Sequence, residues 1–352
     1  LPASRPRAPA ARFTWLLRAA GRVLGHWRPV SAAALLLLAA LVLVQTQTRT
    51  GFILTDHVPE ESPFRATLAR VEAALPGTDR LYVVIEAADP EPGLQPADTA
   101  RLGKAAEAVY GTQLAATPGA GASAAELPRR FAAADGSAFA LPVPVPLGAE
   151  GVLTVAEADR LRDRLAAEGL AGTTSVVGYS LMAATEVPDL IDALRNGLYT
   201  AVLLFAVLAL ALARDLRVAA LSLVPNLVPI LGVEAWLVIR DAPLTLTGAI
   251  AITVAFGIAV DDTIHLLNRL RLARREAGGV AAIRAALVAC LPPVVTTSLI
   301  LLAGFGVTAF SLMPSVGLFG ALVALAVGLA ALSDIFLFPS LLRRGLRKAQ
   351  PA

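Results

Sequence analysis

Six long apolar segments dominate the pattern of hydrophobic and polar positions along the chain. Each is long enough, or nearly so, to cross about 30 Å of hydrocarbon as a helix. They cover residues 29–46, 196–213, 218–239, 244–268, 287–310 and 316–342. The first could instead be a signal peptide, but no convincing cleavage site follows it and five more apolar segments do. The pattern therefore predicts a polytopic α-helical membrane protein with six transmembrane helices.

A long polar region, residues 47–195, separates the first apolar segment from the other five. Apolar residues recur at helical spacing over 63–75, 97–110 and 154–168, whereas 81–85 and 173–179 have the composition of strands. Residues 111–148 are rich in Ala, Gly and Pro, which indicates loops around one strand. Residues 181–195 continue as a helix into the second span. We expect one inserted α+β domain with a ferredoxin-like fold.

The basic residues follow the predicted spans unevenly. Seventeen Lys and Arg residues lie in 1–28, 214–217, 269–284 and 343–348, which share one side if the spans alternate; the opposite short loops hold only Arg240. This positive-inside pattern predicts cytoplasmic termini in a bacterial inner membrane, with 47–195 in the periplasm. That region has 12 basic and 20 acidic residues, a net charge of −8. Because the basic charge is spread over loop ends, nucleic-acid binding explains it poorly.

The chain thus divides into five parts. Residues 1–28 form a basic, amphipathic cytoplasmic linker, 29–46 the first span, 47–195 the periplasmic domain, 196–342 a five-helix block and 343–352 a basic cytoplasmic tail. Hydrophobic residues make up 56% of the chain, far above an ordinary soluble domain. Cys290 is the sole cysteine, and no nucleophile constellation, phosphate loop or metal-ligand cluster occurs. We expect no enzyme activity, no cofactor and no metal.

Two adjacent acids interrupt the fourth apolar segment. Asp262 lies seven residues before Arg269, roughly 10 Å inside the cationic end of a helix. A carboxylate at that depth costs several kcal/mol unless it is protonated, paired or hydrated, so Asp261 and Asp262 indicate proton or ion handling. The alternative is that they cap a span that ends at Val260. The apolar residues that follow them favour the first interpretation.

Other polar residues could support this acid pair in a relay. His265 can share a helix face with either acid, or it could titrate freely at the membrane surface. Thr296, Thr297 and Ser298 in the fifth span could bond a carboxylate on a neighbouring helix, or bond back to their own helix near the preceding prolines. The imidazole and the three hydroxyls are therefore candidates for a supporting role in proton transfer.

Three further polar residues lie within the spans. Asn226 could line a pathway, although it more readily satisfies carbonyl groups freed by Pro229. Glu234 could face a substrate path or reach water at the outer end of the third span. Asp334, nine residues before Arg343, is similarly open to both interpretations.

Several of these motifs resemble one known family. The stretch 257–271, GIAVDDTIHLLNRLR, closely resembles the fourth-helix motif of a half-transporter in the resistance–nodulation–division (RND) superfamily. The nearest branch contains the predicted exporters grouped with MMPL and hopanoid-type lipid transporters. The other matching pieces are 224–229, 293–298, 304–305, 314–317 and 337–342. The resemblance is strong over 217–342 and weak in the inserted domain, where only the order of elements agrees.

The resemblance implies a fold, a function and partners. It implies an RND or sterol-sensing-domain-like bundle in which Asp261 and Asp262 relay protons, assisted by hydroxyls at Thr297 and Ser298. Such transporters have two six-helix halves, and this chain corresponds to the C-terminal one. The expected partners are membrane lipids, a hydrophobic or lipid-like substrate, and an N-terminal half-transporter or a second copy.

We therefore expect a proton-motive-force-driven exporter of hydrophobic or lipid-like substrates, with protons as the coupling ion. A lipid or sterol sensor that does not transport is one alternative, but a sensor does not need the adjacent acids. A Sec-type secretion accessory subunit is another. Its motif normally has Asn before the Asp and lacks the Ile264-His265 that follows Thr263 here.

Overall fold

The computed structural model describes residues 14–51, 57–59, 61–74, 79–86, 100–101, 104–105, 108, 133, 137–145 and 152–346. The chain divides into two compact units, one of Leu1–Thr50 with Leu190–Ala352 and one of Gly51–Asp189. We call these the helical unit and the α+β unit. Most of the predicted helix 97–110 and most of the loop-rich region 111–148 lie outside the described residues.

Among the residues that the structure describes, six helices are long and apolar enough to cross a membrane, in agreement with the predicted number and order of spans. The first five are α2 (Trp27–Gln45), α6 (Tyr179–Ala213), α7 (Leu216–Ile239), α8 (Leu246–Ala273) and α9 (Gly279–Thr308). The sixth runs over Pro314–Leu346 as α10 (Pro314–Leu332), the π-helix η6 (Ser333–Leu337) and α11 (Phe338–Leu346). As predicted, 181–195 continues into the second span, so that α6 is one helix of 35 residues.

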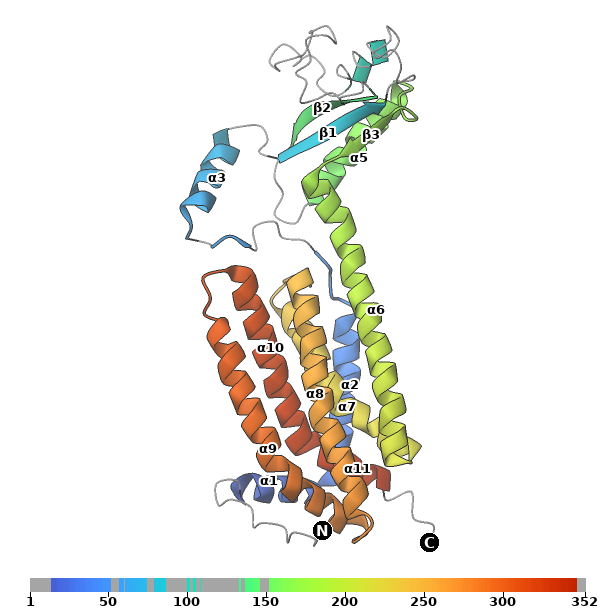
Figure 1. Cartoon of the computed structure of the whole chain (residues 1–352), viewed down its shortest axis with the longest axis vertical. Coiled ribbons are helices and arrows are strands. Elements are labelled where there is room, and N and C mark those ends of the chain that lie inside the picture. Colours follow the sequence, from blue (N-terminus) through green and yellow to red (C-terminus); the bar gives the residue numbers. More distant parts are fainter. Residues whose placement is uncertain are drawn as a thin grey trace. The chain divides into compact units, whose positions relative to one another are not determined.

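Helix α7 lies at the centre of the helical unit. It packs against α2, α8, α10 and α11, and it is the most deeply buried of the six long helices. Helix α10 also packs against α8 and α9 (Figure 1). By contrast α6 exposes Leu203, Leu204 and Val207, which gives it an apolar outer surface suited to lipid. The polar side chains of α7 and α8 can therefore meet inside the bundle.

The predicted amphipathic segment before the first span is the helix α1 (Thr14–Gly25), which lies crosswise at one end of the bundle (Figure 1). Its buried residues Leu16, Ala20 and Leu24 recur at a spacing of four, as one apolar helix face requires. Arg343 of α11 donates to the Leu24 carbonyl and lies over the Trp27 ring. The start and the end of the helical unit are thus joined at the same end of the bundle.

The α+β unit contains a small antiparallel sheet of order β2-β1-β3. Its described elements are α3 (Pro63–Ala74), β1 (Asp79–Glu86), β2 (Ala138–Val145), α5 (Val152–Ala167) and β3 (Thr174–Val177). The central strand β1 places Val83 opposite Leu141 on one side and opposite Val176 on the other. An α+β domain is therefore present, while the finer ferredoxin-like assignment stays a prediction.

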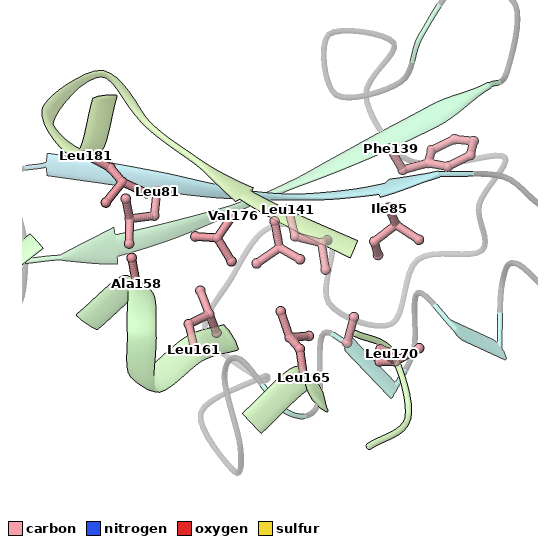
Figure 2. Packing of buried hydrophobic residues seen from close by; sticks show 12 residues of the cluster. Leu81, Ile85, Phe139, Leu141, Ala158, Leu161, Leu165, Leu170, Val176 and Leu181 are labelled. Carbon is pink, nitrogen blue, oxygen red and sulfur yellow. The ribbon is translucent and has the colours of Figure 1, made fainter. Parts of the chain in front are cut away.

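One face of this sheet forms the core with α5. Alternate residues of β1, Leu81, Val83 and Ile85, are at most 1% exposed, as the two-residue period of a strand requires. Figure 2 shows Ala158, Leu161 and Leu165 of α5 facing the sheet. The sheet and α5 are therefore held together mainly by apolar burial.

Replacement of Leu165 by Ala should destabilise the α+β unit by about 2–5 kcal/mol, because Leu165 is 2% exposed and its removal leaves a cavity. Limited proteolysis of the whole protein in detergent should then cleave within 51–189 much faster than in the wild type. The neighbouring variant Arg164→Ala changes an exposed side chain of the same helix and should leave the cleavage rate near wild type. Equal rates for Leu165→Ala and wild type would contradict this packing.

Candidate functional site in the membrane helices

The predicted acid pair lies well inside α8 and not at its end. Helix α8 continues to Ala273, so Asp261 and Asp262 precede its last residue by roughly 16–18 Å. Thr245 caps the other end of the helix, where its hydroxyl accepts from the Gly248 backbone N–H. Helix α8 therefore does not end at Val260, and the two acids do not cap it.

Asp261 and His265 share one face of α8, as their spacing predicts. The His265 Nε2 atom lies 3.5 Å from Asp261 Oδ1, and the two side chains are 68% and 73% exposed. No other part of the described helical unit covers this acid–imidazole pair. In the isolated chain, the pair therefore projects from the bundle surface.

Thr263 points the other way, into the bundle. It is fully buried, and its hydroxyl lies between polar side chains of two other elements. The Asn226 amide of α7 donates to Thr263 Oγ1 at 3.0 Å, and Thr263 Oγ1 lies 3.4 Å from Asp334 Oδ1 of η6. Successive helix residues are about 100° apart, so Asp262 lies between the exposed Asp261 and the buried Thr263. It is accordingly half-buried.

The sequence pattern does not predict that Asn226, Thr263 and Asp334 form a buried trio. It indicates that Asn226 satisfies carbonyls freed by Pro229; the amide instead donates to the Ser222 carbonyl at 2.8 Å and also to Thr263. For Asp334 the pattern allows both a buried and a surface position, and the side chain is only 7% exposed. The sequence feature that points to Asp334 is the presence of an acid within an otherwise apolar span.

The hydroxyls of Thr296 and Thr297 bond to their own helix, α9, in this structure. Thr296 donates to the Pro292 carbonyl, and Thr297 donates to the carbonyls of Pro293 and Val294. The two prolines lie one turn earlier in the same helix, so the back-bonding alternative describes this conformation. Both threonines are exposed, whereas Ser298 is buried. None of the three hydroxyls is bonded to the acid pair, and their supporting role stays a prediction.

Glu234 of α7 is a second buried acid of the helical unit, besides Asp334. It is 2% exposed and interacts with the side chains of Gln45 in α2 and Arg195 in α6. Its Oε2 atom has no hydrogen-bond partner among the residues that the structure describes. Glu234 therefore faces the interior of the bundle and not the surrounding medium. It lies eight residues beyond Asn226, about 12 Å along the helix.

Comparison with known proteins adds no assignment to this geometry. No protein-family model matches the chain, and no curated protein matches it either. In the described part of the chain, no group of three His, Cys, Asp or Glu residues could hold a metal ion. Any functional assignment therefore rests on the acids of α7, α8 and η6.

Proposed function

We propose that this protein is a proton-motive-force-driven exporter of hydrophobic or lipid-like substrates, and that the chain is one six-helix half of an RND-type permease. The observation that carries this proposal is the acid pair Asp261–Asp262 in the interior of a long apolar helix. A charge at such a position is costly in a membrane and marks proton or ion pathways. The motif resemblance around 257–271 supports protons as the coupling ion.

In this proposal Asp261 and Asp262 bind and release the transported protons. His265, 3.5 Å from Asp261, orients that carboxylate and can exchange a proton with it. In another conformation of the bundle, the hydroxyls of Thr296 and Thr297 would turn from their own helix toward the acids, and Ser298 would join them. A change of charge at the acids biases the helices between two arrangements, and so couples proton flow to substrate movement.

The exposed face of α8 favours a partner for the helical unit. If this face contacted lipid, the polar side chains of Asp261 and His265 would be in hydrocarbon, at a cost of several kcal/mol. A partner half or a second copy of the chain that covers this face removes that cost. It also encloses the acid pair between two bundles, as proton coupling requires.

The proposed orientation places the α+β unit in the periplasm and α1 and α11 at the cytoplasmic surface. A cysteine at the exposed position Glu168, in a Cys290→Ser background, should then react with a membrane-impermeant maleimide in intact cells. A cysteine at the exposed position Glu276, between α8 and α9, is the matched control and should react only after the cells are permeabilised. The reverse pattern would overturn the orientation.

Proton-driven export can be tested with a fluorescent short-chain phospholipid as probe, in energised membrane vesicles that contain the complete protein. One proton that crosses 100 mV releases about 2.3 kcal/mol, enough for roughly a fifty-fold gradient of a molecule whose export is coupled to it. We expect probe movement that a protonophore abolishes. Movement of equal rate with and without the protonophore would reject proton coupling, and complete absence of movement would reject lipid-like probes as substrates.

A further inference from the structure

Asp334 is a buried acid that the proposed relay does not use. It lies in the π-helical turn η6, a departure from α-helical geometry that is frequently found at functional sites. Its carboxylate is 7% exposed and faces the Thr263 hydroxyl, 71 positions earlier in the sequence. Burial of an ionised carboxylate is costly unless a cation or several hydrogen bonds compensate it.

The elements packed around η6 offer no such cation among the described residues. Helix α8 contributes Asp262, which carries the same charge sign and acts on Asp334 through space. Helix α7 contributes the neutral Asn226, and α1 contributes its apolar face while Arg18 and Arg22 are exposed. The α10 residues before η6 carry no charge.

The nearest basic residues along the chain, on α11, are engaged elsewhere. Arg343 donates to the Leu24 carbonyl, and Arg344 donates to Ser31 Oγ in α2 at 3.2 Å. Helix α2 also packs against η6, and its one basic residue, Arg28, is exposed and lies over the Trp27 ring. A proton is therefore the simplest positive charge that Asp334 can take up.

The hydrogen-bond partner of the Thr263 hydroxyl depends on whether that proton is present. It has one hydrogen but faces two acceptors, Asp334 Oδ1 at 3.4 Å and Asn226 Oδ1 at 3.3 Å. An ionised Asp334 attracts the hydrogen toward η6 because hydrogen bonds to a charged acceptor are stronger. A neutral Asp334 releases it toward Asn226 and so strengthens the contact between α8 and α7.

We propose that Asp334 is a second proton-binding site of the helical unit. Its protonation state changes the contact between α8 and α7 through Thr263 and Asn226. Uptake of one proton converts the carboxylate into a carboxylic acid, and the charge changes from −1 to zero. Since Asp262 directly precedes Thr263, the protonation state of the acid pair Asp261–Asp262 and that of Asp334 influence each other. The proposal deepens the proposed function and rests on it for its role in transport, but the proton site itself can be tested separately.

A bound proton, and not a metal ion, fits the donors present. The site offers four side-chain oxygens, two from Asp334 and one each from Thr263 and Asn226. The Asn226 amide donates its N–H groups to Thr263 Oγ1 and to the Ser222 carbonyl. N–H groups in this position favour hydrogen-bond acceptors and not a bound cation. Hard cations such as Mg²⁺ and Ca²⁺ require six or more oxygen ligands.

Infrared difference spectra of the purified whole protein, acid minus alkaline buffer, test the site directly. We expect a carboxylic-acid C=O band that Asp334→Asn removes. Thr263→Val, which keeps the shape but loses the hydroxyl, should shift the frequency of this band, and the matched control Thr263→Ser should not. Asp262→Asn should change the pH at which the band titrates, because it removes the neighbouring charge.

Three outcomes would overturn the proposal. The first is identical difference spectra for the wild type and a folded Asp334→Asn variant. The second is an unshifted band in Thr263→Val, which needs no change at Asp334 and so covers the case in which Asp334→Asn does not fold. The third is a carboxylate band that Na⁺ or Mg²⁺ changes at constant pH and that Asp334→Asn lacks. Because these spectra need no transport, failure of the export proposal would leave their result unchanged.

Discussion

Asp261→Asn/Asp262→Asn double substitution should abolish proton-coupled export while the protein still folds and inserts. Asn keeps the size of each side chain but cannot bind and release a proton. Coupling to one proton at 100 mV sustains roughly a fifty-fold probe gradient, so the variant's gradient should fall to about one. Probe movement in membrane vesicles that contain the complete protein, followed with and without a protonophore, measures this loss.

The matched control for the double variant is Glu276→Gln, because Glu276 is an exposed acid outside the long helices. It should transport as the wild type does. His265→Ala and Thr297→Ala should cause smaller losses than the double variant, since each would tune a carboxylate without carrying the transported proton. Uncoupler-sensitive export at the wild-type rate by the double variant would end the relay hypothesis.

Gly320→Ala should prevent the close approach of α10 and α9 and thereby destabilise the helical unit. A methyl group at Gly320 would lie 2.0 Å from Thr308 Oγ1, 2.7 Å from the Phe305 carbonyl and 2.8 Å from the Ala309 nitrogen. Rotation of Thr308 relieves the first contact only, because the other two involve the backbone of α9. Small residues at helix contacts serve this purpose in membrane proteins.

We expect Gly320→Ala to lower the free energy of unfolding by about 1–3 kcal/mol or more, the usual cost of overpacking. Thermal unfolding in detergent, followed by size-exclusion chromatography, should show it as a clearly lowered midpoint. Gly304→Ala is the matched control on the partner helix α9, because a methyl group there meets nothing within 4 Å. Equal midpoints for Gly320→Ala and the wild type would show that α9 and α10 do not pack this closely.

The coarse architecture was predictable because membrane-spanning helices are recognisable by their length and composition. All six spans occur where the apolar segments indicated, and the strands at 81–85 and 173–179 correspond to β1 and β3. The position of the acid pair within a continuing helix also followed from the apolar residues after Asp262. Local patterns of this kind depend on neighbours in sequence, which a single sequence contains.

The contacts of the acids were harder to predict because they depend on helix rotation and on residues distant in sequence. Periodicity alone places Asp261, Asp262 and Thr263 on successive directions around α8, but it does not say which direction faces the bundle. The bond between Thr263 and Asp334 joins residues 71 positions apart, and Asp334 lies in the π-helical turn Ser333–Leu337. The sequence therefore showed Asp334 as an acid within the last apolar segment, but neither its burial nor its partners.

The threonine hydroxyls of α9 show a second limit of prediction from sequence. A Thr near two prolines can bond its own helix or a neighbouring acid, and both options are compatible with the pattern of residues. In this structure Thr296 and Thr297 take the first option.

Substrate-driven proton movement tests the central claim, that Asp261 and Asp262 couple protons to export, most directly. The complete protein is reconstituted into vesicles that contain a pH-sensitive dye, without any imposed proton gradient, and a gradient of the phospholipid probe is then applied. Our account predicts a probe-dependent change of internal pH in the wild type and none in Asp261→Asn/Asp262→Asn. An equal change of internal pH in both proteins would contradict it.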